Sequence, residues 1–502
     1  MSEHYGVSGR CGGYCAGMHQ TTSVWLDRPR ASYPALSGTP TYDVVVVGGG
    51  LTGLLTGLLL ARSGQSTAVL EGRYVGAGAS GNTTGKVSLL QGTKLSRMLS
   101  SNPPSVVRDY VTANQEGQAW LARFAKDHGV PVQERPAYTY ATTRIGELRA
   151  RAELTAAQVA GLDATWETET ELPFEVRGAV RLADQLQLDA MHLLDAIAAA
   201  FIAEGGVLHE RSRVVDLRRS GDGTRVVTRE ASATAGAVVL ATNQPILLRH
   251  GFFARLKAER SYAAALRSSW TPHGMHLSSD PVAHSIRSLP VPGGDELLLV
   301  GGHGHPTGRS RATDRKLADL VGWARSTFPA TELTHTWSAQ DQRSMSTLPY
   351  VGPAFPGDER LFVATGFDKW GFTNAPAAAL LLAKTILGPA ADAELPGWRR
   401  AFSTWTPREV ASSWRGLFYN AEVGAQLAGG YVRNGPRRPV AHSEVDGVEH
   451  DVSKVCPHLG GILRWNEAAR SWDCPLHGSR FAPDGEVLDG PAVCGLKDVR
   501  PS

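Results

Sequence analysis

The apolar positions of this 502-residue chain form regular elements only after about residue 40. Residues 1–40 are rich in Gly, Ser, Thr and Pro and show no periodicity, which predicts a flexible N-terminal leader. The β-branched run Tyr42–Val47 is typical of a strand buried in a parallel sheet. The apolar segment Leu54–Arg62 then predicts a helix that Gly64 can end, and Ser66–Glu71 predicts the second strand.

The glycines between this strand and helix have the spacing G-x-G-x-x-G. Gly48 permits a tight turn, Gly50 lets the backbone approach a pyrophosphate, and Gly53 allows the helix to pack closely on the strand. The helix start supplies unpaired N–H groups for the phosphates. Glu71, eighteen residues after Gly53, is placed to bind ribose hydroxyls. The complete unit predicts a dinucleotide site.

A second glycine-rich stretch, Leu297–His305, also follows an apolar run and raises the possibility of a nicotinamide site. Pro306 and Thr307 interrupt the third-glycine position, and no acidic residue closes a strand after the helix expected near 313–328. We therefore expect a turn at a sheet edge here, which leaves one dinucleotide site in the chain.

Near the C-terminus, Cys456-Pro-His458 and Cys474-Pro-Leu-His477 are separated by fifteen residues. Two thiolates and two imidazoles in this order are the ligand set of a Rieske 2Fe–2S centre, in which the cysteines hold one iron and the histidines the other. Such centres have potentials of about −150 to +300 mV, against about −400 mV for all-cysteine plant-type ferredoxins. Structural zinc is the alternative, but zinc fingers usually place both cysteines in one half-motif and both histidines in the other.

The two loops, C-P-H-L-G-G and C-P-L-H-G-S-R-F, resemble the cluster loops of Rieske ferredoxins. The resemblance implies that Ser479 hydrogen-bonds cluster sulfur and tunes its potential. Gly461 and Leu476 stand where some Rieske proteins carry a disulfide, so the ferredoxin-like subtype fits better.

The segment Gly72–Lys86 has the density of small residues that suits a backbone wrapped around a flat ligand. Here the chain resembles the D-amino-acid oxidase superfamily, which includes glycine, sarcosine and γ-glutamylputrescine oxidases. The family places this loop against the flavin of FAD. Arg213–Val215 resembles its strand whose backbone touches adenine, and Ala237–Asn243 its strand that returns to FAD.

The last landmark of the resemblance is Leu361–Phe367, followed by Lys369–Pro376, which resembles the C-terminal FAD loop and its helix. Amides and the helix dipole near Gly371–Asn374 can stabilise negative charge at the N1–O2 edge of the flavin. The resemblance implies FAD contacts from five parts of the chain: Gly48, Gly50, Leu51, Thr52, Gly53, Glu71, Gly72, Arg73, Ser80, Thr83, Thr84, Lys86, Val214, Thr242, Gly366, Lys369, Trp370, Gly371 and Thr373.

Together the resemblances cover about residues 40–395 and 415–502 and imply the fold. We expect an α/β (α+β) FAD-binding Rossmann-like domain with a mixed-sheet substrate domain in residues 41–395, both discontinuous, and a small all-β Rieske domain in 420–502. Residues 396–419 hold Trp398, Trp405 and Trp414, which favours an ordered connector that packs on both domains. A surface helix with incidental aromatics is the alternative.

The resemblance implies removal of a hydride equivalent from a carbon that bears nitrogen, in a small amine or amino acid. The predicted route is substrate, FAD, 2Fe–2S cluster and an external acceptor, either a protein or oxygen. Lys86 and Trp370 are catalytic candidates because they lie in flavin-contacting segments. For Lys86 we consider contact with flavin N5 through water, or polarisation of bound oxygen. The alternative is an ordinary FAD-binding or surface lysine. Arg343 either binds a substrate carboxylate or forms a structural salt bridge, and Arg260 and Tyr262 are weaker candidates.

Composition and charge limit the partners and the cellular compartment that we expect for the protein. A net charge of +3 with no long run of one sign gives no indication of a nucleic-acid partner. The longest apolar stretches, Leu54–Ala61 and Ala377–Leu387, are too short to span a membrane. Outside the cluster motif only Cys11, Cys15 and Cys494 remain, an odd number that favours a reducing cytoplasm, and no secretory signal is evident. A metal site at Cys11 and Cys15, with His4 and His19, is less favoured than disorder.

Other redox classes fit less well. A Rieske oxygenase needs a mononuclear iron site with two histidines and a carboxylate, normally in a domain after the Rieske domain, and only 25 residues follow His477. A ferredoxin-reductase-like electron-transfer flavoprotein needs a nicotinamide site, which the single fingerprint disfavours. A redox sensor without turnover stays open.

Overall fold

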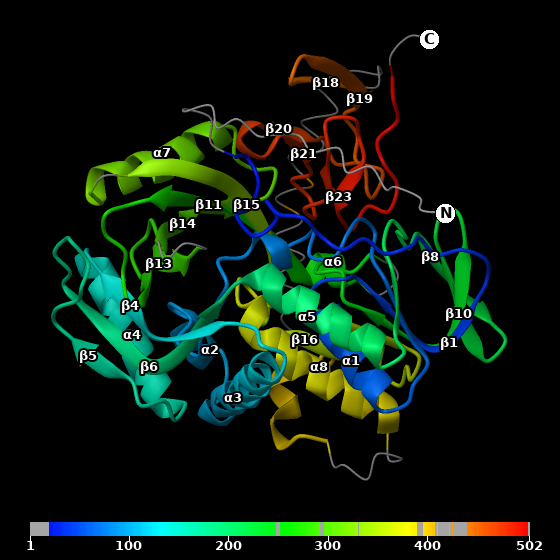
Figure 1. Cartoon of the computed structure of the whole chain (residues 1–502), viewed down its shortest axis with the longest axis horizontal. Coiled ribbons are helices and arrows are strands. Elements are labelled where there is room, and N and C mark those ends of the chain that lie inside the picture. Colours follow the sequence, from blue (N-terminus) through cyan, green and yellow to red (C-terminus); the bar gives the residue numbers. More distant parts are fainter. Residues whose placement is uncertain are drawn as a thin grey trace, which may run out of the picture.

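The computed structural model describes residues 20–246, 251–291, 296–329, 331–388, 395–406, 409, 421, 424 and 439–499. Two large sheets with helices around them make up the described part of the chain up to residue 406, and a small all-β domain follows (Figure 1). The helices are α1 (Leu51–Arg62), α2 (Lys94–Leu99), α3 (Pro104–Asp127), α4 (Arg144–Val159), α5 (Ala190–Ala203), α6 (Phe252–Arg255), α7 (Thr313–Thr327) and α8 (Gly371–Leu387).

The first sheet has the order β16-β17-β10-β1-β2-β7, with β8 and β9 attached to β10. Its centre is parallel, and Val44–Val47 of β1 are buried between β10 and β2. Helix α1 packs against α5 and α8, which lie with it on one side of this sheet (Figure 1). The strands are β1 (Thr41–Val47), β2 (Thr67–Leu70), β7 (Val207–His209), β8 (Asp216–Ser220), β9 (Gly223–Val227), β10 (Ser232–Leu240), β16 (Tyr350–Pro353) and β17 (Leu361–Thr365).

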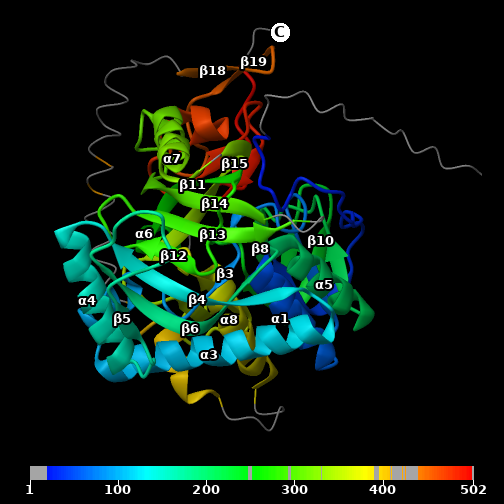
Figure 2. The ribbon, with the colours of Figure 1, turned by 60° about the vertical axis from the view of Figure 1, so that its left-hand side comes forward.

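The second sheet is mostly antiparallel and has the order β15-β11-β14-β13-β12-β4-β6-β3, with β5 beside β6. Figure 2 shows its strands stacked from β6 up to β15, the end that lies nearest the C-terminal domain. The strands are β3 (Lys86–Val87), β4 (Val132–Ala141), β5 (Thr165–Glu167), β6 (Gly178–Leu188), β11 (Leu256–Arg267), β12 (Met275–Ser278), β13 (His284–Pro290), β14 (Glu296–Pro306) and β15 (Glu332–Ser344).

The C-terminal domain contains a two-stranded and a four-stranded antiparallel sheet. Its own small core includes Leu463, Trp472 and Phe481, together with Cys456 and Cys474. The strands are β18 (Val440–Val445), β19 (Val448–Ser453), β20 (Arg464–Asn466), β21 (Ser471–Asp473), β22 (Arg480–Phe481) and β23 (Val487–Asp489), with short 3-10 helices η4 (Gly397–Phe402) in the connector and η5 (Glu467–Ala469) after β20.

The predicted fold class is confirmed, and the strand–helix–strand unit is β1, α1 and β2, although α1 begins at Leu51 rather than Leu54. The edge turn expected at Leu297–His305 is wrong. Strand β14 runs through it and lies inside the sheet, between β11 and β13, and an extra residue of β14 between Gly302 and His305 shifts its register with β11. The strand expected at Arg213–Val215 is also displaced, since β8 begins only at Asp216.

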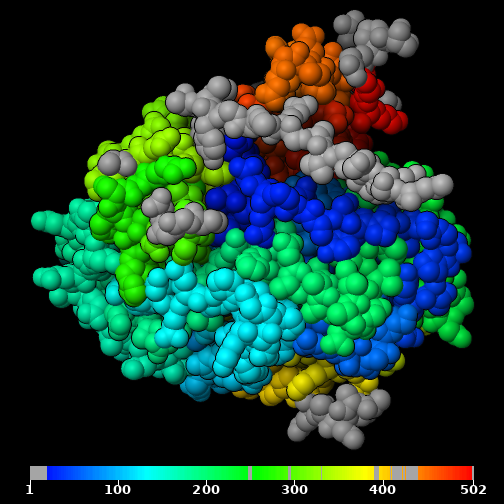
Figure 3. Space-filling view, in the orientation of Figure 1, coloured from blue at the N-terminus to red at the C-terminus, as the bar shows by residue number. Residues whose placement is uncertain are grey.

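The predicted flexible leader is wrong for its second half. Trp25 and Leu36 are buried, and Trp25 Nε1 donates a hydrogen bond to the Thr83 carbonyl at 2.7 Å. Figure 3 shows this blue segment lying across the molecule below the orange and red C-terminal domain. Residues 1–19, with Cys11 and Cys15, lie outside the described residues.

The connector is ordered where the structure describes it. Trp398 is buried and donates to Glu116 at 2.8 Å, and Trp405 donates to the Ala354 carbonyl at 3.0 Å. Both contacts are with the FAD-domain side, and Trp414 lies outside the described residues. None of the helices in the described ranges combines the length and apolar character needed to cross a bilayer.

Candidate functional site

The glycine-rich turn after β1 leaves no room for side chains. A Cβ on Gly48 (φ +115°) would lie 2.6 Å from the Ala241 carbonyl oxygen, and a Cβ on Gly53 would overlap the Gly48 carbonyl oxygen. The turn therefore brings α1 directly against the ends of β1 and β10. Gly50, the N-cap residue of α1, has no side chain to cap the helix, and the first turn contains no acidic residue. The partial positive charge of the helix start is therefore not neutralised by the helix itself and is available to a bound phosphate.

Glu71 is held at the end of β2 by two backbone donors. Gly49 N–H donates to Oε2 and Arg73 N–H donates to Oε1, both at 2.8 Å. A carboxylate has further acceptor sites, so Glu71 can still accept hydrogen bonds from the hydroxyl groups of a ribose. Ser80 Oγ accepts from Leu51 N–H at 3.0 Å and so lies at the start of α1, where a pyrophosphate would bind.

A cavity of about 680 Å³ extends from this turn to the face of the second sheet. The predicted FAD residues line it, with the exception of Gly53, Gly366 and Thr373. Gly53 packs α1 on the turn as expected, Gly366 (φ +81°) faces Ser344, and the Thr373 hydroxyl accepts from Ser88 N–H at 3.1 Å. The cradle thus fits FAD, and we propose the lining members of the predicted set as its contacts.

Lys86 of β3 reaches the same cavity, and its ammonium donates to Ser285 Oγ of β13. Burial lowers the pKa of Lys86 to about 7, and the nearby charge of Arg287 acts in the same direction. Arg287 is itself buried and donates to the carbonyls of Thr84 and Gly85 at 2.7 and 2.9 Å, which fixes the backbone just before Lys86. Lys86 can therefore exchange a proton near neutral pH.

The opposite end of the cavity is formed by the loop before α8. Asp368 and Lys369 both have left-handed backbone conformations, with φ of 52° and 72°. Although burial opposes its charged form, Lys94, Arg97 and Arg343 together hold the pKa of Asp368 well below its usual range. Trp370, which is 8% exposed, caps α8 and accepts from Asn374 N–H at 2.9 Å. This geometry aims the start of α8 into the cavity.

The two arginines considered for substrate binding are occupied by other partners. Arg343 pairs with Asp368 at 3.0 Å and with Glu259 at 3.5 Å, and it does not line the cavity. Arg260 is fully buried and faces Asp473 of the C-terminal domain. These contacts favour the alternative for Arg343, a structural ion pair, and its role as a substrate ligand stays a prediction.

The sequence did not single out two carboxylates of the cavity. Glu259 on β11 and Asp341 on β15 lie on the cavity side of neighbouring strands, as does Tyr262 on β11, one of the weaker candidates from the sequence. Burial, with the nearby carboxylates of Asp368 and Glu259, raises the pKa of Asp341 to about 6 against the opposing effect of Lys369. The period of two along these long strands marks which positions share a face, but not which face meets the flavin.

The cluster motif forms two loops of the same shape. Gly460 N–H donates to the Cys456 carbonyl at 3.0 Å, and Gly478 N–H donates to the Cys474 carbonyl at 3.2 Å. Both glycines have positive φ, 75° and 81°, which a turn of this kind requires. The first loop is closed by the Val455–Ile462 bridge and the second joins β21 to β22. The loops thus present their ligands toward one another.

The four predicted ligands are ready for metal binding. Backbone N–H groups of His458 and Leu459 face the Cys456 sulfur, and those of Leu476 and His477 face the Cys474 sulfur. Burial lowers the pKa of His458 to about 4 and of His477 to about 3, so both rings are neutral. His458 Nε2 and His477 Nδ1 are buried and have no hydrogen-bond partner. Since buried polar atoms are normally paired, this is consistent with a bound group that completes the site.

This arrangement fits two irons better than one zinc. The histidine rings face each other edge to face, with centroids 5.2 Å apart. In a Rieske cluster each iron needs only two protein ligands, and each of the two loops supplies one cysteine and one histidine. A Cβ on Gly461 would lie 2.7 Å from Cys474 Sγ and 2.9 Å from Leu476. The two loops are therefore in close contact at the positions where some Rieske proteins carry a disulfide.

Ser479 is fully buried, and its hydroxyl oxygen accepts from Ala492 N–H at 3.0 Å. Hydrogen bonds from Cys474 and, to a smaller extent, from the Ser479 hydroxyl lower the pKa of the Cys456 thiol, while burial opposes them. The hydroxyl therefore faces the Cys456 sulfur, and its hydrogen bond to cluster sulfur stays a prediction of the resemblance.

The two large sheets and the C-terminal domain share the cavity wall. Leu488, Asp489 and Gly490 of the C-terminal domain line the same cavity as the glycine-rich turn. Arg213, beside that turn, donates to the Val487 carbonyl of β23 at 2.7 Å. The fold and the two sites define a flavoprotein with a docked iron–sulfur domain.

Comparison with known proteins agrees. The model of the FAD dependent oxidoreductase family (DAO) matches residues 43–385, and the Rieske [2Fe-2S] domain model matches residues 431–500. The chain belongs to the FAD dependent oxidoreductase family and carries a C-terminal Rieske domain; its cofactors are FAD and a 2Fe–2S cluster. It is an FAD-dependent oxidoreductase.

Individual relatives match either the whole chain or its first part. YhfW of Bacillus subtilis, whose name describes a Rieske 2Fe-2S iron-sulfur protein, is 28% identical over 93% of this chain and 95% of its own. The crystal structure of glycine oxidase from Geobacillus kaustophilus has a TM-score of 0.62 at 23% identity and covers 73% of this chain and 99% of its own. L-amino acid deaminase from Proteus vulgaris has a TM-score of 0.58 at 13% identity, over 75% and 99%.

Proposed function

We propose that this protein oxidises a C–N bond of a small amine or amino acid, and that the electrons pass from FAD to the Rieske cluster and then to an external one-electron acceptor. The observation that carries the proposal is the shared wall: Leu488–Gly490 of the Rieske domain line the FAD cavity. The names of the structural neighbours, glycine oxidase and L-amino acid deaminase, support the substrate class.

The electron count fits the two cofactors. FAD supplies a two-electron acceptor for a hydride equivalent, and the substrate leaves as an imine that water hydrolyses. A 2Fe–2S cluster carries one electron at a time, so each substrate requires two transfers to the cluster and two to the acceptor.

Lys86 is the proton acceptor in this proposal. An amine binds mostly as an ammonium and must lose a proton before its carbon can give up a hydride. With a pKa of about 7, Lys86 Nζ is partly neutral at physiological pH and can take that proton inside the cavity. Trp370 and the start of α8 would hold the ring edge opposite Lys86.

The test is an anaerobic screen of amino acids, amines and polyamines for bleaching of the flavin, with NADH and NADPH alongside. Bleaching by an amine or amino acid, followed by one-electron reduction of the cluster, supports the proposal. Rapid bleaching by NADH or NADPH and by no amine would replace it with the ferredoxin-reductase-like alternative.

A further inference from the structure

The second cluster loop is pressed against the substrate domain. A Cβ on Gly478, the residue after His477, would overlap Ala258 Cβ of β11. A Cβ on Gly308 would lie 2.6 Å from Pro475 N and 2.7 Å from the Cys474 carbonyl carbon. Two glycines at the contact therefore allow the loop that carries two cluster ligands to approach the sheet backbone to backbone.

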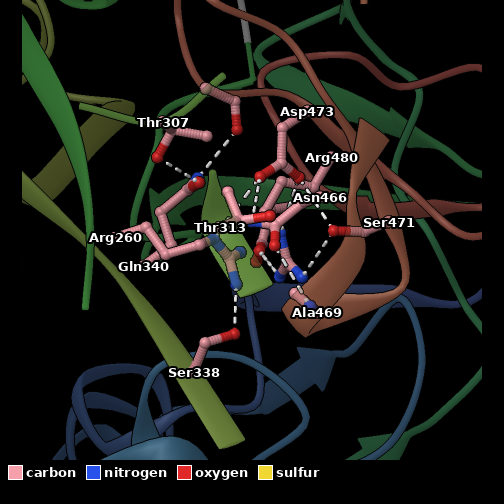
Figure 4. Close-up of polar contacts among 12 residues, drawn as sticks. Arg260, Thr307, Thr313, Ser338, Gln340, Asn466, Ala469, Ser471, Asp473 and Arg480 are labelled. Carbon is pink, nitrogen blue, oxygen red and sulfur yellow. Dashed lines mark hydrogen bonds and ion pairs between the residues drawn. The ribbon is translucent and has the colours of Figure 1, made fainter. Parts of the chain in front are cut away.

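Gln340 of β15 connects this loop to the FAD cavity. Its Nε2 donates to the Gly478 carbonyl at 2.7 Å, and its Oε1 accepts from Thr307 Oγ1 at 2.9 Å (Figure 4). Its own carbonyl accepts from Asn243 Nδ2 at 3.0 Å, and Asn243 lines the cavity. One side chain and its backbone thus join the residue beside a cluster ligand to the wall of the flavin site.

A buried, charge-balanced group lies beside this contact and joins the same two domains. Arg260 of β11 is 0% exposed and faces Asp473 at 3.6 Å, and Arg480 faces Asp473 at 3.4 Å (Figure 4). Arg480 also pairs with Asp489 at 2.7 Å. Two arginines and two aspartates leave no net charge, so the group is stable only while the domains are together and each charge keeps its partner.

Two hydrogen bonds around this group also cross the interface. Tyr262 of the cavity wall donates to Asn466 Oδ1 at 3.4 Å, and Asn466 Nδ2 in turn donates to Asp473 within the C-terminal domain at 2.9 Å. Thr313 at the start of α7 accepts from Glu467 N–H at 3.0 Å. The interface is therefore polar, buried and specific in geometry, which favours one fixed docked arrangement over a sliding contact.

We propose that Gln340 fixes the cluster loop Cys474–Gly478 against the wall of the FAD cavity and is a positioning residue for electron transfer between the two cofactors. The proposal rests on the proposed function for the direction of electron flow. Within it, Gln340 neither binds a cofactor nor takes an electron; it sets the position of the loop relative to the cavity.

The test compares Gln340→Met, which keeps the length of the side chain and removes both of its hydrogen bonds, with Gln185→Met. Gln185 is equally buried at 3% and also accepts an N–H and donates to a carbonyl, but on β6, away from the cluster. Gln340→Glu is the second variant, because it keeps an acceptor for Thr307 and places a carboxylate oxygen, in place of the donor, against the Gly478 carbonyl. All are used as holoenzyme with FAD content and cluster EPR checked first.

Two readouts follow. Hydrogen exchange at the amides of Leu476, His477 and Gly478 should become about tenfold faster in Gln340→Met, since one hydrogen bond of typical net strength corresponds to a factor of this order. After anaerobic photoreduction with 5-deazariboflavin and EDTA, electron equilibration between flavin and cluster should slow in both Gln340 variants and stay unchanged in Gln185→Met.

Unchanged exchange, or faster exchange with unchanged equilibration, overturns the positioning role. If the wild-type flavin and cluster never exchange electrons, the proposed function fails, and the exchange comparison alone then decides whether Gln340 holds the loop. Slower equilibration in Gln340→Glu with a normal cluster spectrum supports the proposal even if Gln340→Met does not fold.

Discussion

The cluster pocket and the FAD cavity are built in opposite ways. The cluster ligands and Ser479 come from two similar turns between Cys456 and Ser479, and each turn is closed by its own backbone hydrogen bonds. The FAD cavity is lined by residues from Val47 to Gly490, which include both large sheets and the Rieske domain. A site made of local turns can be read from spacing, whereas a site made of distant strands depends on how the sheets pack.

The difference extends to polarity. In the cluster pocket, burial keeps both histidines neutral. The cavity contains a lysine with a pKa near 7 and a carboxylate with a pKa near 6, where a proton can move. We therefore expect changes in the pocket to stop electron flow outright, and changes in the cavity to alter rates and their pH dependence.

Removal of a cluster ligand should have the largest effect. Cys474→Ser should lose acid-labile sulfide and the cluster EPR signal and keep its FAD, because the two cofactor sites use different residues. Substrate should still bleach the flavin, while reduction of a one-electron acceptor falls to background. Cys494→Ser, at an exposed free cysteine, is the matched control and should behave as wild type. Unchanged turnover with every acceptor would remove the cluster from the electron path.

Lys86→Met should lower the rate of flavin reduction by about 10²–10⁴-fold, the usual contribution of one positioned proton acceptor. Because the pKa of Lys86 is depressed to about 7, its amine becomes neutral as the pH rises through that value. The wild-type rate should therefore rise through pH 7 and level off. Stopped-flow reduction from pH 6 to 9 checks this, and a step at pH 7 that persists in Lys86→Met would contradict the role.

Arg260→Met should weaken domain docking without removing either cofactor. It leaves Asp473 buried with one arginine fewer, a change that costs about 3 kcal/mol when a buried pair is broken. The melting temperature of the Rieske domain, followed by loss of cluster absorbance, should fall. Arg470→Met, at an exposed pair with Asp446 in the same domain, should cost under about 1 kcal/mol. Equal shifts in the two variants would mean that the buried group does not hold the domain.

Arg343→Met should have the smallest effect on chemistry. Asp368 keeps Lys94 and Arg97 as partners, so the loop before α8 stays in place. The substrate concentration for half-maximal flavin reduction should change by less than about twofold, because Arg343 does not line the cavity. A large increase at unchanged FAD content would restore Arg343 as a substrate ligand.

Much of the fold followed from local pattern. The β-branched run, the glycines and the acidic strand end predicted β1, α1, β2 and the FAD turn, because each feature satisfies a steric demand within about 30 residues. The local sequence pattern gave wrong predictions where tertiary contacts decide the structure. The glycines of β14 look like a turn, yet β11 and β13 hold them in the middle of a sheet. Residues 20–40 lack periodicity, yet Trp25 is buried against distant segments.

The sequence alone determined the two cofactors, since cluster ligation and phosphate binding need fixed residue types at short spacings. Only the tertiary structure decided that Arg343 and Arg260 serve as ion-pair partners and that Lys86 has a lowered pKa. It alone also decided that Gln340 lies between the cluster loop and the cavity. The physical reason is that burial and pairing depend on which strands meet, and neighbours such as Gln340 and Gly478 are 138 residues apart in the chain.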